Sequence, residues 1–175
     1  MSSITCKFGG TSLASADSIQ QALAIIQAKD ERKYIVPPAP GKRTPEDKKI
    51  TDLLIAWYHI LQDDLDPAQP IAIIRERFNG LKKELGSTLD FDAEIDTIIA
   101  QAPTHKTPDY LASRGEFLNG KLIADILNAT FIDPADYIHF DTRGNLDPKS
   151  YDTLGAVLQG QGRFVIPGFY GTNPQ

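Results

Sequence analysis

The sequence contains a single cysteine, Cys6, in 175 residues. An internal disulfide needs two cysteines, so none can form, and a zinc site built from cysteines is excluded for the same reason. The three histidines lie far apart, and no two of them have the i, i+4 spacing that metal ligands on one helix face need. We therefore expect no metal ion held directly by this chain.

Long apolar runs and strongly basic stretches are also missing. The longest apolar run is about six residues, whereas a membrane-spanning helix needs about 20. Acidic residues outnumber basic ones by 23 to 18, for a formal net charge of −5, which disfavours nucleic acid and anionic membrane surfaces as partners. The N-terminus lacks the charged and then apolar regions of a secretory signal. We expect a cytoplasmic protein that binds neither nucleic acid nor membrane.

Composition and length are those of an ordinary globular domain. Hydrophobic residues make up 41% and charged residues 23% of the chain, and the length fits one domain that buries a core. A β-prone stretch at 3–8 is followed by Gly9 and Gly10, an amphipathic helix over 13–29 and a second strand at 34–36. This order is a βαβ unit, which predicts that the first two strands are parallel.

The remaining segments continue this pattern. Apolar periodicity and flanking glycine or proline residues predict helices at 51–61, 71–85 (ended by Gly86), 92–102, 110–128 and 151–159, and strands at 130–132, 138–140 and 163–166. The fold class that we predict is α/β: a three-layer αβα sandwich with a mainly parallel sheet between helices.

The first glycine turn has the features of an anion site. Lys7 ends a strand, Gly9 and Gly10 let the backbone approach a ligand closely, and Thr11 and Ser12 precede a helix. Backbone N–H groups and the helix N-terminus would then face a phosphate, with Lys7 as a fixed positive charge. The alternative is an ordinary βα turn with an exposed lysine.

Glu116 is a second candidate, because its helix face is otherwise apolar or small. It shares that face with Ser113, Gly120 and Ile123, so its carboxylate should point inward and need a cationic partner. A substrate ammonium group would serve. The alternative is a structural ion pair with Arg114 or another basic residue, or a helix cap.

A second glycine turn, Pro-Gly-Phe-Tyr-Gly at 167–171, follows the last predicted strand. Ligands of open parallel sheets collect at the carboxyl ends of strands, so the two glycine turns would face each other across a crevice. An ordinary turn is the alternative.

Four stretches of the sequence resemble motifs of the aspartokinases, which belong to the amino acid kinase superfamily. They are Lys-Phe-Gly-Gly-Thr-Ser at 7–12, Ala-Pro-Gly-Lys at 39–42 with Ile-Thr-Asp-Leu-Leu at 50–54, Ser-Arg-Gly-Glu at 113–116 and Val-Ile-Pro-Gly-Phe-Tyr-Gly at 165–171. The four occur in the order of the family. The resemblance covers the whole chain but only the first part of the family's catalytic domain.

The resemblance implies ATP-dependent phosphorylation of the side-chain carboxylate of L-aspartate, with Mg²⁺. The product is aspartyl 4-phosphate, on the route to lysine, threonine and methionine. Lys7 would be the catalytic residue, which binds ATP phosphate and stabilises the phosphoryl group in transfer. Thr51 and Glu116 would bind aspartate, with Glu116 on its ammonium group. The implied positions near ATP phosphate and the reacting groups are Gly9, Gly10, Thr11, Ser12, Gly168 and Gly171.

The resemblance also implies parts that these residues do not include. Residues 1–175 would be the N-terminal, substrate-binding portion of an amino acid kinase domain, without the later nucleotide-binding segments or the regulatory ACT domains. We therefore expect the natural chain to continue past Gln175 and this portion alone to have little activity. Relatives usually dimerise, so a homodimer fits the resemblance.

Pro38 departs from the family pattern, which usually has serine at this position. A hydroxyl and an N–H that help to hold aspartate in relatives are therefore missing here. Two other functions stay open. One is another carboxylate kinase, acting on glutamate or acetylglutamate. Thr51 and Glu116 in their motifs favour aspartate over these substrates. The other is a non-catalytic relative that binds a ligand, which Pro38 and the early end of the sequence favour.

Overall fold

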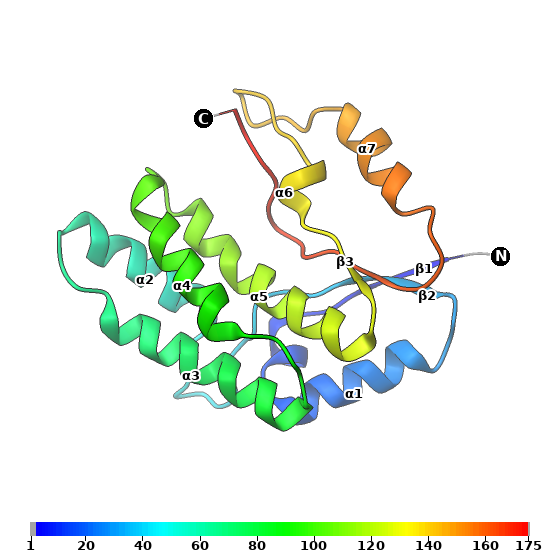
Figure 1. Cartoon of the computed structure of the whole chain (residues 1–175), viewed down its shortest axis with the longest axis horizontal. Helices are drawn as coiled ribbons and strands as arrows, with labels where there is room; N and C mark the ends of the chain where they lie inside the picture. The colour runs from blue at the N-terminus through cyan, green and yellow to red at the C-terminus, as the bar shows by residue number, and fades with distance from the viewer. Residues whose placement is uncertain (1–2, 175) are drawn as a thin grey trace.

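The computed structural model describes residues 3–174 and contains one parallel sheet with helices on both faces (Figure 1). The four strands of the sheet are β1 (Ile4–Lys7), β2 (Arg32–Val36), β3 (Thr130–Phe131) and β4 (Phe164–Val165), in the order β1-β2-β4-β3. All three strand pairs are parallel. The predicted three-layer α/β sandwich is therefore confirmed.

The helices follow the predicted pattern closely. They are α1 (Ala16–Gln27), α2 (Ile50–Gln62), α3 (Ala68–Leu85), α4 (Phe91–Gln101), α5 (Asp109–Leu127), α6 (Pro134–Tyr137) and α7 (Lys149–Val157), with short 3-10 turns at Gly10–Leu13 and Ala102–Thr104. No helix within residues 3–174 is long and apolar enough to cross a bilayer.

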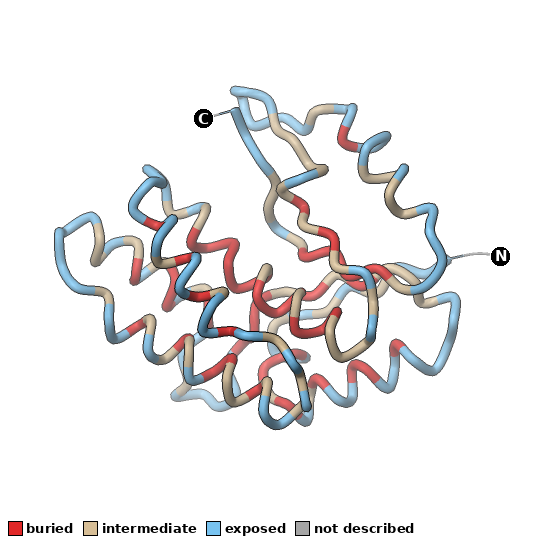
Figure 2. Tube along the Cα trace, viewed as in Figure 1, coloured by how far each residue is buried: buried red, intermediate tan, exposed pale blue. Residues whose placement is uncertain are grey.

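Alternating side chains of the strands divide the core into two parts. Ile35 and Val165 are fully buried in the larger part, which α1, α2, α3, α4 and α5 fill. Phe164 and Ile166 point to the opposite face and form a smaller cluster with Ile132, against which side chains of α7 pack. Buried segments accordingly run along the sheet and along the inner sides of the helices (Figure 2). The period of two along a strand explains this division.

Local capping signals fix the start of α1 and the end of α3. The Ser15 side chain accepts a hydrogen bond from the Ser18 backbone N–H, and the Ser18 hydroxyl accepts one from the Ser15 backbone N–H, so α1 begins with a capping box. Gly86 has a φ of 71° and ends α3, as expected of a left-handed C-terminal residue that glycine adopts without strain.

Three segments differ from the prediction, one of them the short helix α6, which was not predicted. The helix expected over 13–29 is divided, because the 3-10 turn Gly10–Leu13 precedes α1. The strand predicted at 138–140 is wrong: His139 and Phe140 form only isolated bridges, with Thr172 and Leu146. The chain has already left the sheet, since the N-cap of Asp133 begins the short helix α6 just before this segment.

The larger core depends on two stacked aromatic rings. Phe78 of α3 and Phe91 of α4 are both fully buried, with ring centroids 5.3 Å apart. We expect Phe78→Ala to lower the free energy of unfolding by about 3–5 kcal/mol, because it removes buried apolar surface and leaves a cavity. Urea denaturation measures this loss. Ile25→Ala, at a side chain of α1 that is about half exposed, is the control, and an equal loss there would contradict the assignment.

Candidate functional site

The loops that follow β1, β2 and β4 meet at one edge of the sheet. The three strands are parallel, so their carboxyl ends share that edge. The Gly41 N–H donates a hydrogen bond to the Gly10 carbonyl at 2.9 Å, which joins the loop after β2 to the loop after β1. A Cβ on Gly41 would lie 2.7 Å from the Gly10 carbonyl carbon. Only glycine at this position permits so close an approach.

A cavity of about 340 Å³ opens beside this contact. Its lining comes from the two joined loops, the start of α2 and one residue of α5. The lining residues are Gly10, Thr11, Pro38, Ala39, Pro40, Gly41, Lys42, Lys49, Thr51 and Glu116.

A glycine brings α5 against this cavity. A Cβ on Gly115 would lie 2.7 Å from the Ala39 Cβ and 3.1 Å from the Ile50 Cγ2, so any larger residue would push the helix away. The next residue in α5 is Glu116, whose side chain consequently reaches the cavity wall. Gly115 therefore permits the close packing of α5 against the loop, and Glu116, the next residue, places its carboxylate at the cavity as a result.

Glu116 is a buried carboxylate without an internal counter-ion. Its residue surface is 8% exposed, its Oε2 atom has no hydrogen-bond partner, and it forms no ion pair with any residue in the described range. Burial raises the pKa of Glu116, against smaller lowering effects of the Ala39 backbone N–H and the Arg114 charge. A cationic ligand group in the cavity would compensate this desolvation.

Positive charge stands on another part of the lining. Lys42 and Lys49 are exposed residues that line the cavity, and Thr51 lies in the first turn of α2. The lining thus includes one buried carboxylate and two lysine residues, of which Lys42 donates from its ammonium group to the Pro45 carbonyl at 3.3 Å. This combination suits a small ligand that carries a cationic group and an acidic group together, such as an amino acid.

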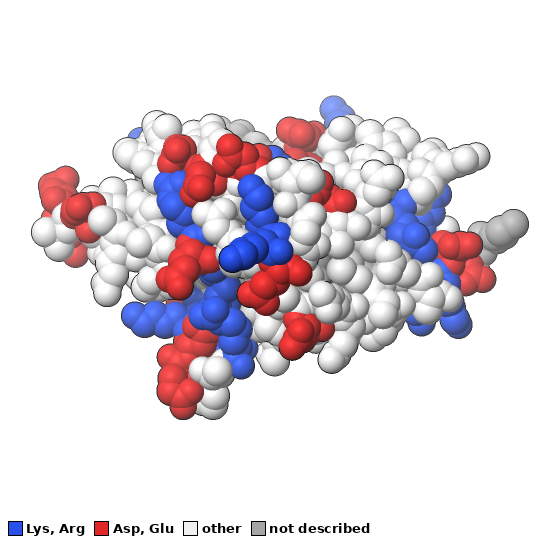
Figure 3. Space-filling view, turned by 60° about the horizontal axis from the view of Figure 1, so that its bottom comes forward, with Lys and Arg blue, Asp and Glu red and all other residues white. Residues whose placement is uncertain are grey.

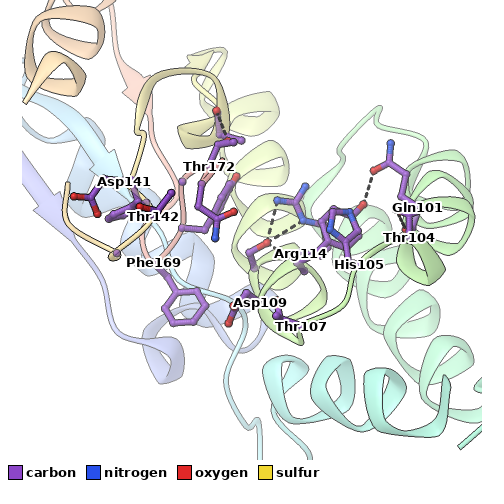
Figure 4. Close-up of a pocket in the computed structure, with 18 residues that line it drawn as sticks. Gln101, Thr104, His105, Thr107, Asp109, Arg114, Asp141, Thr142, Phe169 and Thr172 are labelled. Carbon is purple, nitrogen blue, oxygen red and sulfur yellow. Dashed lines mark hydrogen bonds between the residues drawn. The ribbon is translucent and has the colours of Figure 1, made fainter. Parts of the chain in front are cut away.

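A second cavity, of about 880 Å³, lies between the start of α5 and the loops at 139–144 and 169–173. Arg114 and His105 stand on one side of it and Asp141, Thr142 and Thr172 on the other (Figure 4).

Arg114 does not pair with Glu116, so that structural alternative is wrong. Its guanidinium carbon lies 4.8, 4.6 and 5.0 Å from the ring centroids of Tyr110, Phe117 and Tyr170. Its Nε and one terminal nitrogen donate hydrogen bonds to the Ser113 hydroxyl. Aromatic faces hold this cation in place.

The structure brings four of the predicted site residues together. Gly10, Thr11, Thr51 and Glu116 line the same 340 Å³ cavity, although they come from three separate motifs. The resemblance assigns Thr51 and Glu116 to one substrate, and the structure places both at one cavity.

The other predicted residues lie outside that cavity. Lys7, Gly9 and Ser12 are exposed at the end of β1 and in the turn after it. A Cβ on Gly168 would contact the Val36 side chain at 3.3 Å, and Gly171 lines the larger cavity. Lys7 is the register partner of Val36, so it belongs to the same sheet edge as the loops that form the cavity.

Sequence reasoning missed Lys49 and Asn119. Lys49 precedes the Ile-Thr-Asp-Leu-Leu motif and lines the cavity, and its place next to the motif was the available signal. Asn119 is fully buried, and its side-chain amide donates to the Pro38 carbonyl at 2.7 Å. Asn119 follows Glu116 by three positions, which places both on one face of α5.

Charge on the molecular surface is mixed. On the face shown in Figure 3, acidic and basic groups are interspersed. Arg75 of α3 pairs with Asp92 at 2.8 Å and Asp96 at 2.6 Å, both from α4. Pairs of this kind add little stability but keep the surface polar.

Comparison with known proteins relates this geometry to one family. Residues 4–175 match the model of the amino acid kinase family. The sequence is 33% identical over 181 aligned positions to aspartokinase 3 of Bacillus subtilis (strain 168), and this alignment covers 94% of the chain and 40% of the relative.

Solved structures agree. The crystal structure of Clostridium acetobutylicum aspartate kinase is similar with a TM-score of 0.95 and 37% identity, over 99% of this chain and 40% of that one. E. coli aspartokinase III, solved in complex with aspartate and ADP, shares the fold with a TM-score of 0.79 and 22% identity, over 98% and 42%. The chain therefore spans about two fifths of the length of these relatives.

The raised pKa of Glu116 predicts a distinctive pH dependence of stability. A folded pKa above the unfolded value stabilises the fold at acidic pH, and this contribution is lost as the pH rises through the folded pKa. We expect Glu116→Gln, which carries no charge at any pH, to gain stability relative to the wild type as the pH rises from about 4 to about 8. Urea denaturation at several pH values measures the difference.

Asp125→Asn is the control with the opposite sign. Hydrogen bonds from Ser87 and Thr88 lower the pKa of Asp125, so the wild-type carboxylate stabilises the fold above the unfolded pKa. The asparagine variant should lose stability relative to the wild type as the pH rises to about 5 and should change little between about pH 5 and about pH 8. A stability difference for Glu116→Gln that stays flat with pH would remove the argument for a desolvated carboxylate.

Proposed function

The chain belongs to the amino acid kinase family, and on this premise we propose that its protein phosphorylates the side-chain carboxylate of L-aspartate with ATP, giving aspartyl 4-phosphate. The observation that carries the proposal is the buried Glu116 carboxylate with an unpartnered oxygen at the wall of a small cavity. Similarity to aspartate kinases at 33% and 37% identity supports aspartate over other acids.

Glu116 and Thr51 are the proposed aspartate contacts. The ammonium group of an amino acid placed against Glu116 Oε2 supplies the missing hydrogen-bond donor and the missing positive charge. We assign the Thr51 hydroxyl and the two lysines of the lining to the acidic end of the substrate. E. coli aspartokinase III, with the same fold, was solved with aspartate and ADP, so a fold of this type accommodates both ligands.

Lys7 and the first glycine turn are the proposed phosphate site. Lys7 is exposed and forms no ion pair with a described residue. A Cβ on Gly9 would meet nothing within 4 Å, so there is open space beside the backbone for a phosphate oxygen. These features fit ATP, with Gly10, Thr11 and Ser12 continuing the turn. We also assign Gly168 and Gly171, in the loop after β4, to binding ATP phosphate near the reacting groups.

Magnesium is proposed to arrive with the nucleotide. Among residues 3–174, no group of three or more histidine, cysteine or acidic side chains is placed to hold a metal ion. Mg²⁺ commonly binds through substrate phosphates with few protein ligands, so this chain fits that mode. When bound, Mg²⁺ neutralises negative charge on the phosphates.

The reaction asks this chain for positioning rather than for a base. The nucleophile is the substrate's own carboxylate, which is ionised at neutral pH and needs no proton removed. Its oxygen forms the new bond to the γ-phosphorus, and ADP leaves. The contribution of the protein is to orient both substrates and to balance negative charge, and we assign the balancing of charge to Lys7.

The test is a hydroxamate assay on the protein as its natural reading frame encodes it. Hydroxylamine traps acyl phosphates as coloured hydroxamates, so product from L-aspartate with ATP supports the proposal. Product only from L-glutamate or N-acetylglutamate would move the assignment to another carboxylate kinase. If no acid yields product and calorimetry detects no aspartate binding, the proposal fails. The binding measurement is essential because Pro38, in the lining of the cavity, cannot supply a backbone N–H to aspartate.

We expect Lys7→Ala to lower kcat for aspartate phosphorylation by about 10³-fold or more, because it removes the positive charge on the transferring phosphoryl group. The exposed position of Lys7 predicts an unchanged Tm. Lys33→Ala, on β2, is the control. Near-normal turnover of Lys7→Ala would exclude the proposed role.

We expect Glu116→Gln to raise KM for aspartate by roughly 10- to 100-fold, since it removes a charge-assisted contact to the ammonium group. KM for ATP should change little. Glu94→Gln, which breaks the ion pair of Glu94 with Lys121 away from the cavity, should leave both constants unchanged. An unaltered KM for aspartate in Glu116→Gln would make Glu116 a structural residue.

A further inference from the structure

A buried arginine of α3 holds the loop that forms one wall of the small cavity. Arg77 is only 4% exposed. One terminal nitrogen donates to the Gly41 carbonyl at 3.1 Å, and the other donates to Asp47 Oδ2 at 2.5 Å and to the Lys48 carbonyl at 3.5 Å. A single guanidinium thus connects both ends of the segment 41–48.

Asp47 is the second anchor of this segment. Besides Arg77, it accepts hydrogen bonds from the Arg43 backbone N–H at 2.9 Å and from Arg43 Nε at 2.8 Å. These contacts outweigh partial burial and hold the pKa of Asp47 well below its usual range. The loop contains no helix or strand, so its conformation depends on these side-chain contacts rather than on a backbone hydrogen-bond ladder.

The anchored loop carries the ligand-facing groups. Gly41, Lys42 and Lys49 all line the cavity that contains Glu116. Arg77 contacts the carbonyl of Gly41, while the N–H of the same residue donates to the Gly10 carbonyl. Gly41 is therefore held from two directions, by α3 and by the glycine turn after β1.

Burying the Arg77 guanidinium costs desolvation free energy, which a purely structural contact made by apolar residues would avoid. Its Nε atom is buried without a hydrogen-bond partner, and replacing a buried ion pair with apolar residues is often neutral or stabilising. We propose that Arg77 is a positioning residue: it holds the 41–49 loop so that Lys42 and Lys49 face the acidic end of the substrate whose ammonium group contacts Glu116. This inference rests on the proposed function for the identity of the substrate.

The key variants are Arg77→Met, Arg77→Lys and Arg75→Met in the naturally encoded protein. Arg75 is the matched control, because it lies on the same helix but pairs with Asp92 and Asp96 instead of the loop. We expect Arg77→Met to raise KM for aspartate about tenfold while kcat changes less, the signature of lost binding rather than lost transition-state contact. Arg77→Lys should recover only part of the affinity, because lysine lacks the planar fork that reaches two partners.

A ligand-free measurement accompanies the kinetics. Amide hydrogen exchange across 41–49 should accelerate in Arg77→Met and in Asp47→Asn, but not in Arg75→Met, because only the first two release the loop. Asp47→Asn also serves if Arg77→Met does not fold.

The outcomes separate the two proposals. Unchanged KM for aspartate in the Arg77 and Asp47 variants, or unchanged exchange across 41–49, overturns the role of Arg77. A loss of stability with KM unchanged overturns it too, since it shows a structural contact only. If the wild type neither binds nor phosphorylates aspartate, the proposed function fails, and with it the substrate role of Arg77, whereas accelerated exchange would still show that Arg77 holds the loop.

Discussion

The location of the buried carboxylate depends on a steric contact made by its neighbour. Gly115 lets α5 approach Ala39 so closely that a Cβ would overlap it, and only at that separation does Glu116 reach the cavity formed by the loops after β1 and β2. The close contact of Gly41 with Gly10 acts in the same way on the opposite wall. Close packing of small residues therefore decides where charge is placed, and charge decides which ligand suits the cavity.

Local sequence signals predict much of this arrangement. Two parallel strands around a glycine turn, the stop of α3 at Gly86 and the inward direction of Glu116 all follow from patterns within a few residues. Helix and strand periodicities carry such information because neighbouring side chains share a face. Thr51 and Glu116, which the resemblance assigns to the same substrate, line one cavity.

Contacts between distant residues are what the sequence does not reveal. Arg77 and Asp47 lie 30 residues apart, and nothing near either residue marks it as a partner of the other. The strand prediction at 138–140 is wrong for a related reason. Its β-prone residues predict a strand, but α6 has already carried the chain away from the sheet. Tertiary context overrides β-propensity in such cases. The role of Lys7 stays a prediction, because its exposed side chain lies outside the cavity that contains Glu116.

The two buried clusters differ in size, so the two faces of the sheet differ in the free energy that local opening requires. Helices α1 to α5 share the larger cluster, whereas the opposite face is covered through Ile132, Phe164 and Ile166 with few side chains of α7. Less apolar surface is lost when the smaller cluster separates, so local opening there costs less free energy than opening of the larger one. Thermal fluctuation should therefore concentrate around α7, while the walls around Glu116 keep their shape between one encounter with a ligand and the next.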